Sequence, residues 1–212
     1  MKKMSNKLRI AEILNRLRAE YPDADCELTY KNPLQLLIAV ILSAQCTDAR
    51  VNTVTPALFA RYKSAKDFAE ANLQELEGFV KSTGFYKNKA KNIQQCCRQL
   101  VLQHGGEVPE TMEELVQLAG VGRKTANAVR MHAFGEPGLT VDTHFQRLCK
   151  RMGLIRETHP VKIEKEIEKL LPEKDWTDFS SCLIFHGRRC CKARKPECCR
   201  CVVKEFCPSN QC

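Results

Sequence analysis

The chain has 212 residues, which is enough for one large domain or two small lobes with buried cores. Its formal net charge of +9 favours a polyanionic partner such as nucleic acid, although excess lysine can also simply keep a protein soluble. The longest apolar run, residues 34–42, is far shorter than the roughly 18–20 residues that span a bilayer, which excludes a membrane-spanning protein.

Helical periodicity runs through the chain, and almost no segment alternates with a period of two. Ser5 is positioned to cap a first helix that ends near Glu20, and Asn32-Pro33 opens a helix that is apolar on nearly all sides and therefore buried. Residues 135–140 are a candidate crossing between lobes. Further helices are predicted near residues 48–60, 64–71, 73–81, 86–103, 111–118, 123–134, 143–152, 160–171 and 176–188, and several of them start at Ser, Thr, Asn or Asp. The sequence therefore predicts an all-α protein.

A glycine pair stands between two of these helices. Gly120-Val121-Gly122 precedes a helix whose first turn carries Arg123 and Lys124. Glycine permits a positive φ and close backbone approach, so the N–H groups at the helix start can face a phosphate. Taken alone, the pattern is weak evidence, and a tight turn between two helices explains it somewhat better.

An aspartate precedes a later helix. Asp142 lies eighteen residues beyond Lys124, in the segment "LTVDTHFQRLCKRMG". An aspartate in this place usually caps the helix, because its carboxylate accepts the free N–H groups of the first turn. That role does not exclude a chemical one.

Seven of the thirteen cysteines fall within residues 190–212, among many Lys and Arg residues. A disulfide framework is one explanation, but thirteen is odd and the first twenty residues lack the apolar core of a signal peptide. We therefore expect a soluble protein of a reducing compartment whose clustered thiols bind metal. Spacing alone places zinc slightly ahead of an iron–sulfur cluster, since four thiolates suit either.

Five ordered segments resemble the endonuclease III family, the bifunctional DNA glycosylases and abasic-site lyases of the helix-hairpin-helix superfamily. The segments are "LSAQCTD" (42–48), "GFYKNKAKNI" (84–93), "LAGVGRKTANAV" (118–129), "VDTHFQRLCKR" (141–151) and "HGRRCCKARKPECCRCVVKEFC" (186–207). The resemblance implies an all-α, two-lobed fold with a DNA cleft between the lobes. It places a six-helix lobe at residues 27–136, with the helix-hairpin-helix near 112–135, and a second lobe at residues 1–26 plus 137–212.

The resemblance also implies the cofactor. One four-iron four-sulfur cluster per chain would be held by Cys191, Cys198, Cys201 and Cys207, within the loop 191–207, which reverses the preference for zinc. Cys190, Cys199 and Cys212 are then supernumerary. The loop between the first two ligands would present Lys192, Arg194 and Lys195 to DNA backbone phosphates.

By the same resemblance, Lys124 forms a covalent imine with the sugar, and Asp142 stabilises the cationic sugar and shuttles protons. Gly120, Val121, Gly122 and Arg123 of the hairpin contact the DNA backbone. Gln45 fills the gap left by the flipped nucleotide, while Phe85 wedges into the opposite strand. Two residues depart from the family pattern: Phe85 stands where Leu is frequent, and Ala119 where proline is frequent.

The expected partner is double-stranded DNA with oxidised pyrimidines or abasic sites, acted on by a monomer in the cytoplasm, at the nucleoid. Three other functions are alternatives. An adenine-mismatch glycosylase shares the fold, but its members generally lack the lysine and carry a further C-terminal domain. A noncatalytic iron–sulfur DNA-binding module gives no role to Lys124 and Asp142. A zinc-stabilised transcription factor would need a base-reading helix, which the sequence does not contain.

Overall fold

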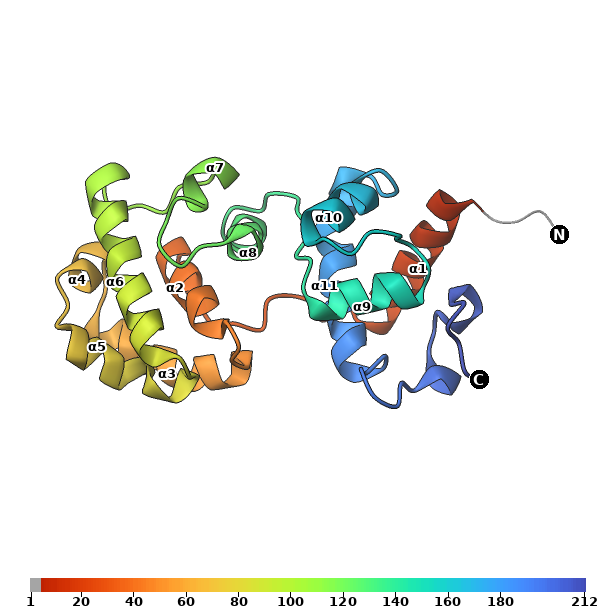
Figure 1. Cartoon of the computed structure of the whole chain (residues 1–212), viewed down its shortest axis with the longest axis horizontal. Helices are drawn as coiled ribbons and strands as arrows, with labels where there is room; N and C mark the ends of the chain where they lie inside the picture. Colours follow the sequence, from red (N-terminus) through yellow and green to blue (C-terminus); the bar gives the residue numbers. More distant parts are fainter. Residues whose placement is uncertain (1–4) are drawn as a thin grey trace. The chain divides into compact units, whose positions relative to one another are not determined.

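The computed structural model describes residues 5–212, and every regular element in this range is a helix (Figure 1). The prediction of an all-α protein is confirmed. The chain divides into two compact units. The central unit is Cys26–Glu136, and the terminal unit combines the residues up to Asp25 with Pro137–Cys212. Residues 1–4 of the predicted second lobe lie outside the described residues.

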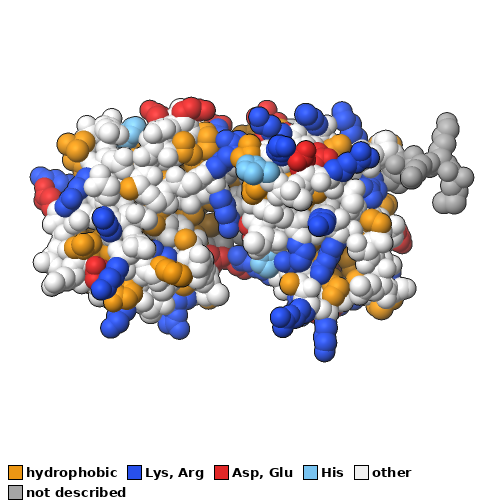
Figure 2. All heavy atoms as spheres, viewed as in Figure 1, with side chains coloured by type: hydrophobic (Ala, Val, Ile, Leu, Met, Phe, Trp, Pro, Cys, Tyr) orange, Lys and Arg blue, Asp and Glu red, His pale blue; other side chains and the backbone are white. Residues whose placement is uncertain are grey.

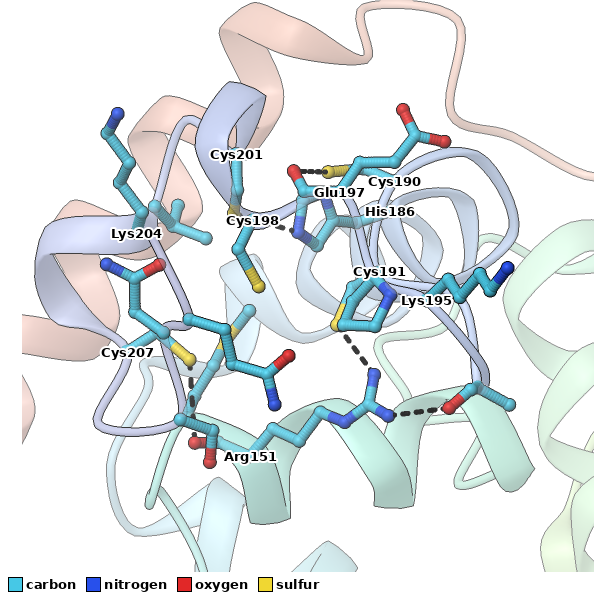
Figure 3. A pocket seen from close by; sticks show the side chains of 17 residues that line it. Arg151, His186, Cys190, Cys191, Lys195, Glu197, Cys198, Cys201, Lys204 and Cys207 are labelled. Atoms are coloured by element: carbon cyan, nitrogen blue, oxygen red, sulfur yellow. Dashed lines mark hydrogen bonds between the residues drawn. The ribbon is translucent and has the colours of Figure 1, made fainter.

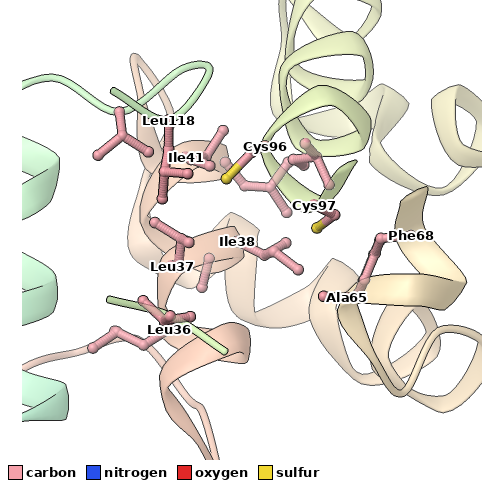
Figure 4. Packing of buried hydrophobic residues seen from close by; sticks show 14 of the residues in the cluster. Leu36, Leu37, Ile38, Ile41, Ala65, Phe68, Cys96, Cys97 and Leu118 are labelled. Atoms are coloured by element: carbon pink, nitrogen blue, oxygen red, sulfur yellow. The ribbon is translucent and has the colours of Figure 1, made fainter. Parts of the chain in front are cut away.

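The central unit contains a buried helix surrounded by other helices. The fully buried residues Leu36, Leu37 and Ile38 belong to α2, and they meet Phe68 and Cys97 in one apolar cluster (Figure 4). Helix α6 packs against α2, α4 and α5 around this cluster. The helices are α2 (Pro33–Ser43), α3 (Asp48–Arg61), α4 (Ala65–Ala69), α5 (Leu73–Val80), η1 (Lys81–Thr83), α6 (Tyr86–Gln103), α7 (Met112–Leu115) and α8 (Arg123–Ala133).

Side-chain caps fix where five of these helices start. The side-chain oxygen of Asn32, Thr47, Ser64, Asn72 or Thr111 accepts a hydrogen bond from the backbone N–H of the third residue in the helix that follows. Each such cap satisfies a donor that has no partner within the helix and typically stabilises a protein by about 1 kcal/mol. This is why the sequence predicts most helix starts to within a residue.

Helix ends differ more from the prediction. The predicted helix 111–118 ends at Leu115. After it the chain continues in tighter turns, in which each hydrogen bond joins residues three positions apart: Leu118 N–H donates to Leu115 O, and Val121 N–H to Leu118 O. The predicted helix 160–171 ends at Glu168, since Pro172 disfavours the helical conformation in the residue before it. The first of these differences lies in the hairpin itself.

The terminal unit has its own core. Phe145 and Phe179 meet edge to face with their ring centres 5.8 Å apart, among Ile10, Leu14 and Leu17 of the first helix. The helices are α1 (Asn6–Glu20), α9 (Thr143–Arg151), α10 (Pro160–Glu168), η2 (Glu173–Asp175), α11 (Trp176–Arg189), η3 (Cys198–Arg200) and η4 (Lys204–Phe206). Across residues 5–212, no helix is sufficiently long and apolar to cross a membrane.

Candidate catalytic residues and metal site

The hairpin between α7 and α8 requires glycine at position 120. Gly120 has φ +78°, and a Cβ at this position would lie 2.9 Å from the Asn92 Cβ on α6. Gly122 directly precedes α8, whose first turn receives no hydrogen bond from a capping side chain. The N–H groups of that turn are therefore the kind of donors that bind a phosphate.

Gln99 of α6 holds the hairpin loop by both ends of its side-chain amide. Its Oε1 accepts from Ala119 N–H at 2.8 Å, and its Nε2 donates to Gln117 O at 3.0 Å. A proline at position 119 would have no N–H to offer. In this chain, therefore, a hydrogen bond from Ala119 N–H to Gln99 restrains the loop where the family frequently has the rigid ring of a proline.

The two predicted catalytic residues each occupy the start of a helix. Lys124 is exposed in the first turn of α8, in the central unit. Asp142 is half-buried in the terminal unit, where its Oδ1 accepts from Phe145 N–H at 2.8 Å and caps α9. The capping role of Asp142 is therefore present.

Gln45 and Phe85 share an unusual backbone conformation. Their φ angles are 54° and 48°, in the left-handed region that non-glycine residues rarely adopt. Among residues 5–212, the third non-glycine residue with a positive φ is Lys195, also a predicted DNA contact. Gln45 is exposed and Phe85 is 65 % exposed, so Phe85 is not a core aromatic. Such strain often accompanies a functional side chain.

The four predicted metal ligands line one cavity of about 540 Å³ in the terminal unit (Figure 3). Cys191, Cys198, Cys201 and Cys207 contribute their side chains to its wall. A set of four cysteine thiols matches the donor chemistry of a metal cluster. The cysteine-rich region therefore fits a metal cluster bound by soft ligands.

Two side-chain nitrogen atoms lie within hydrogen-bonding distance of sulfur atoms of this set. Arg151 Nη1 donates to Cys191 Sγ at 3.2 Å, and His186 Nε2 lies 3.4 Å from Cys201 Sγ. Burial lowers the pKa of His186 to about 4, and Tyr21 Oη lies 2.8 Å from its Nδ1. A neutral ring that accepts from Tyr21 carries its proton on Nε2, facing the sulfur. Hydrogen bonds of this kind orient and tune thiolate ligands.

The supernumerary cysteines have distinct surroundings. Cys199 forms a disulfide with Cys212. The sequence indicates that the clustered cysteines do not form a framework of disulfides, and it does not predict this single one. Cys190 is buried, and its sulfur lies within 4.8 Å of donor atoms of His186 and Cys201. This trio is a second, more compact set of metal donors, and it shares Cys201 with the first.

The cationic loop after Cys191 is fixed from α9. Arg151 donates to the backbone oxygens of Lys192 and Ala193, both at 2.8 Å. Lys192 also pairs with Glu197 at 2.7 Å, so part of its charge is neutralised within the loop, whereas Arg194 is exposed. On the face drawn in Figure 2, Lys and Arg side chains (blue) protrude from the terminal unit.

Sequence reasoning missed the residues that support these sites. Three of them, Gln99, Arg151 and His186, are described above. Arg147 donates to Gly187 O and Cys191 O, both at 3.0 Å, and the buried Lys89 donates to Leu42 O at 2.8 Å and Thr83 O at 2.7 Å. Only Lys89 left a clear signal. It lies on the same helical face as Ile93, Cys97 and Leu100, where a lysine is out of place. The arginines and Gln99 act through backbone oxygens and N–H groups far away in the sequence, which no spacing reveals.

Comparison with known proteins agrees with this geometry. The family model described as "HhH-GPD superfamily base excision DNA repair protein" matches residues 38–173. The hairpin and the matched segment define the class, a base excision DNA repair protein of the helix-hairpin-helix type.

More specific matches span nearly the whole chain. Endonuclease III of Synechocystis sp. is 54 % identical over 99 % of this chain and 96 % of its own length. Endonuclease III of Escherichia coli K12 is 42 % identical over 95 % of this chain and 96 % of its own length. A solved structure of a non-covalent endonuclease III–DNA complex superposes with a TM-score of 0.93, at 45 % identity, covering 98 % of this chain and 97 % of that one. The chain belongs to the endonuclease III family, and it is a base excision repair DNA glycosylase and abasic-site lyase.

Proposed function

We propose that this enzyme excises oxidised pyrimidines from double-stranded DNA through a covalent imine on Lys124, and then cuts the strand by β-elimination. The observation that carries this proposal is the place of Lys124, exposed in the first turn of α8, directly after a glycine turn that brings no capping side chain to the helix start. A backbone phosphate bound there would bring a sugar to the lysine. One similar solved structure, at 45 % identity, is that of a trapped endonuclease III–DNA covalent intermediate.

The reaction needs a neutral amine as nucleophile. The Lys124 nitrogen forms a bond to the anomeric carbon as the bond from that carbon to the base breaks, and the base leaves with a proton. Opening of the sugar ring gives the imine. Removal of a proton from the neighbouring carbon then expels the 3′ phosphate, and water releases the enzyme. Asp142 would stabilise the positive charge on the sugar and move the protons.

Extrusion of the damaged nucleotide is assigned to Gln45 and Phe85. Both side chains are exposed in the central unit on strained, left-handed residues. Gln45 offers an amide that can hydrogen-bond to the bases left in the stack. Phe85 offers an apolar ring that can fill space in the opposite strand, as apolar wedges do in other DNA-bending proteins.

The metal is proposed to be one four-iron four-sulfur cluster on Cys191, Cys198, Cys201 and Cys207. These cysteines surround a cavity, whereas the compact trio that includes His186 would suit a single ion. When bound, the cluster would cross-link the loop that carries Arg194 and Lys195, so that both meet DNA phosphates. We assign the enzyme to the cytoplasm, at the nucleoid, as a monomer.

Borohydride trapping on duplexes with thymine glycol or an abasic site tests the proposal, because reduction converts the imine into a stable bond. The wild-type protein should become covalently attached to either DNA. Lys124→Gln should bind DNA but lose trapping and strand cleavage. Lys66→Gln, which changes the same position in the first turn of α4, is the matched control and should trap normally. Base release without trapping by the wild type would overturn the covalent mechanism.

A further inference from the structure

Lys89 is a buried lysine near the start of α6, with only 5 % of its surface exposed. Its Nζ donates to Leu42 O at 2.8 Å and to Thr83 O at 2.7 Å. Both acceptors are backbone oxygens in the same central unit. The ammonium group therefore joins three segments of the chain through one side chain.

The two acceptors lie next to the residues assigned to base extrusion. Leu42 is the second-last residue of α2 and precedes Gln45 by three positions. Thr83 ends η1 and precedes Phe85 by two. Gln45 and Phe85 are also the two residues of this unit with a strained, left-handed backbone and a non-glycine side chain. Lys89 thus fixes the chain just ahead of both.

Packing alone does not explain a lysine here. Position 89 lies on the same buried face of α6 as Ile93, Cys97 and Leu100. An apolar side chain could be buried there without the free-energy cost of removing a charged group from water. Burial lowers the pKa of Lys89, which shows that the charge is held at a cost. What the ammonium group adds is a bond to the free carbonyls that end two helices, where a cation is favourable.

We propose that Lys89 is a positioning residue that holds the segments of Gln45 and Phe85 in a fixed relation, so that both act in one base-extrusion step. The inference rests on the proposed function of those two residues. It assigns Lys89 no contact with DNA.

The test compares two substrates. Fluorescence of 2-aminopurine beside a thymine glycol reports base extrusion, and cleavage at a preformed abasic site reports the step that needs no base expelled. Lys89→Met and Lys89→Gln should slow extrusion by about tenfold or more, as expected when a reacting group is misplaced. Abasic-site cleavage should change less than about threefold by the same reasoning. Gln94→Met is the matched control, because Gln94 is also buried on α6 and donates to a backbone oxygen, that of Ala71 at 2.7 Å.

A double-mutant cycle separates positioning from general stability. In the background of Gln45→Ala with Phe85→Ala, Lys89→Met should slow extrusion little further, because the groups it positions are gone. Three outcomes would each overturn the proposal. The effects of Lys89→Met and of the two alanine substitutions on extrusion could be additive, or Lys89→Met could slow both substrates equally. Both Lys89 variants could also fail to fold where Gln94→Met folds. If Gln45→Ala and Phe85→Ala leave extrusion unchanged, the proposed extrusion function falls as well. Slow extrusion in those variants with normal extrusion in Lys89→Met overturns only the role of Lys89.

Discussion

The side-chain amide of Gln99 holds the backbone of Ala119, whose N–H donates to Gln99 Oε1 at 2.8 Å. Gln99→Met keeps the size of the side chain and removes this bond together with the one to Gln117 O. We expect a loss of about 1–2 kcal/mol in the free energy of unfolding, since a half-buried N–H loses its partner. Affinity for damaged and undamaged duplex should fall together, because the hairpin is proposed to contact backbone phosphates, and such contacts do not read bases.

A double-mutant cycle in denaturant unfolding checks the pairing. Ala119→Pro removes the N–H that Gln99 accepts. In that background Gln99→Met should therefore cost less than it does in the wild type. Equal costs in the two backgrounds would mean that Gln99 does not restrain the loop through Ala119.

Gly120→Ala should weaken DNA binding by distorting the hairpin. The new methyl group would lie 2.9 Å from Asn92 Cβ, on a residue with φ +78°. Strain and overpacking together should cost about 1–3 kcal/mol in unfolding experiments. Gly78→Ala in α5 is the matched control, since its Cβ meets no atom within 4 Å and a helical alanine stabilises by about 1 kcal/mol. Gly120→Ala protein with normal DNA affinity would contradict the assignment.

The sequence predicts what depends on local chemistry. Helix starts follow from caps such as Asn32 and Ser64, which bond their own backbone three residues later. The turn at position 120 is predicted from the sequence because glycine readily adopts a positive φ. The contact that excludes a larger residue there is with Asn92 on another helix, which the sequence does not reveal. Candidate site residues came from motif resemblance, and their roles stay predictions. The supports of the sites depend on tertiary contacts, as between Lys89 and Leu42 O, which no local pattern encodes.

Cysteine replacements should separate ligands from bystanders. Cys198→Ser removes a predicted ligand that lines the cavity, so iron bound per chain and the stability of the terminal unit should both fall. Cys212→Ser removes the disulfide partner of Cys199 and should leave iron content unchanged. Iron and sulfide assays with the absorption spectrum measure both. Equal loss of iron in the two variants would mean that the ligand assignment is wrong.

The stability of the terminal unit should decrease in mild acid through His144. Burial lowers the pKa of His144, as do Arg147 and Arg188, while Asp142 and a backbone contact at Gly187 oppose the shift. The unfolded chain therefore binds the proton at higher pH than the folded one. Stability is full above the ordinary histidine pKa of about 6.5 and is lost as pH falls from there through the lowered value.

Thermal unfolding at pH 7.5 and 5.5 measures this effect. His144→Asn should reduce the difference between the two melting temperatures. His159→Asn, at an exposed histidine of the same unit, is the control and should leave that difference as in the wild type. An unchanged pH difference in His144→Asn would assign the acid sensitivity to other groups.

Asp142→Asn tests the division of labour between the two proposed catalytic residues, Lys124 and Asp142. Asp142 also caps α9, and asparagine caps a helix about as well as aspartate, so the variant should fold normally. Base excision from a thymine glycol duplex should fall by about 10²–10⁴, because a neutral amide neither stabilises a cationic sugar nor transfers a proton. Cleavage at a preformed abasic site should fall much less, since no base is expelled there and Lys124 is intact. Single-turnover assays on both substrates measure the ratio of the two losses in rate.

Asp142→Ala, which loses the cap as well, should be less stable by about 1 kcal/mol and show the same ratio of rate losses. Equal losses on the two substrates in Asp142→Asn would show that Asp142 serves the imine chemistry itself and not the departure of the base.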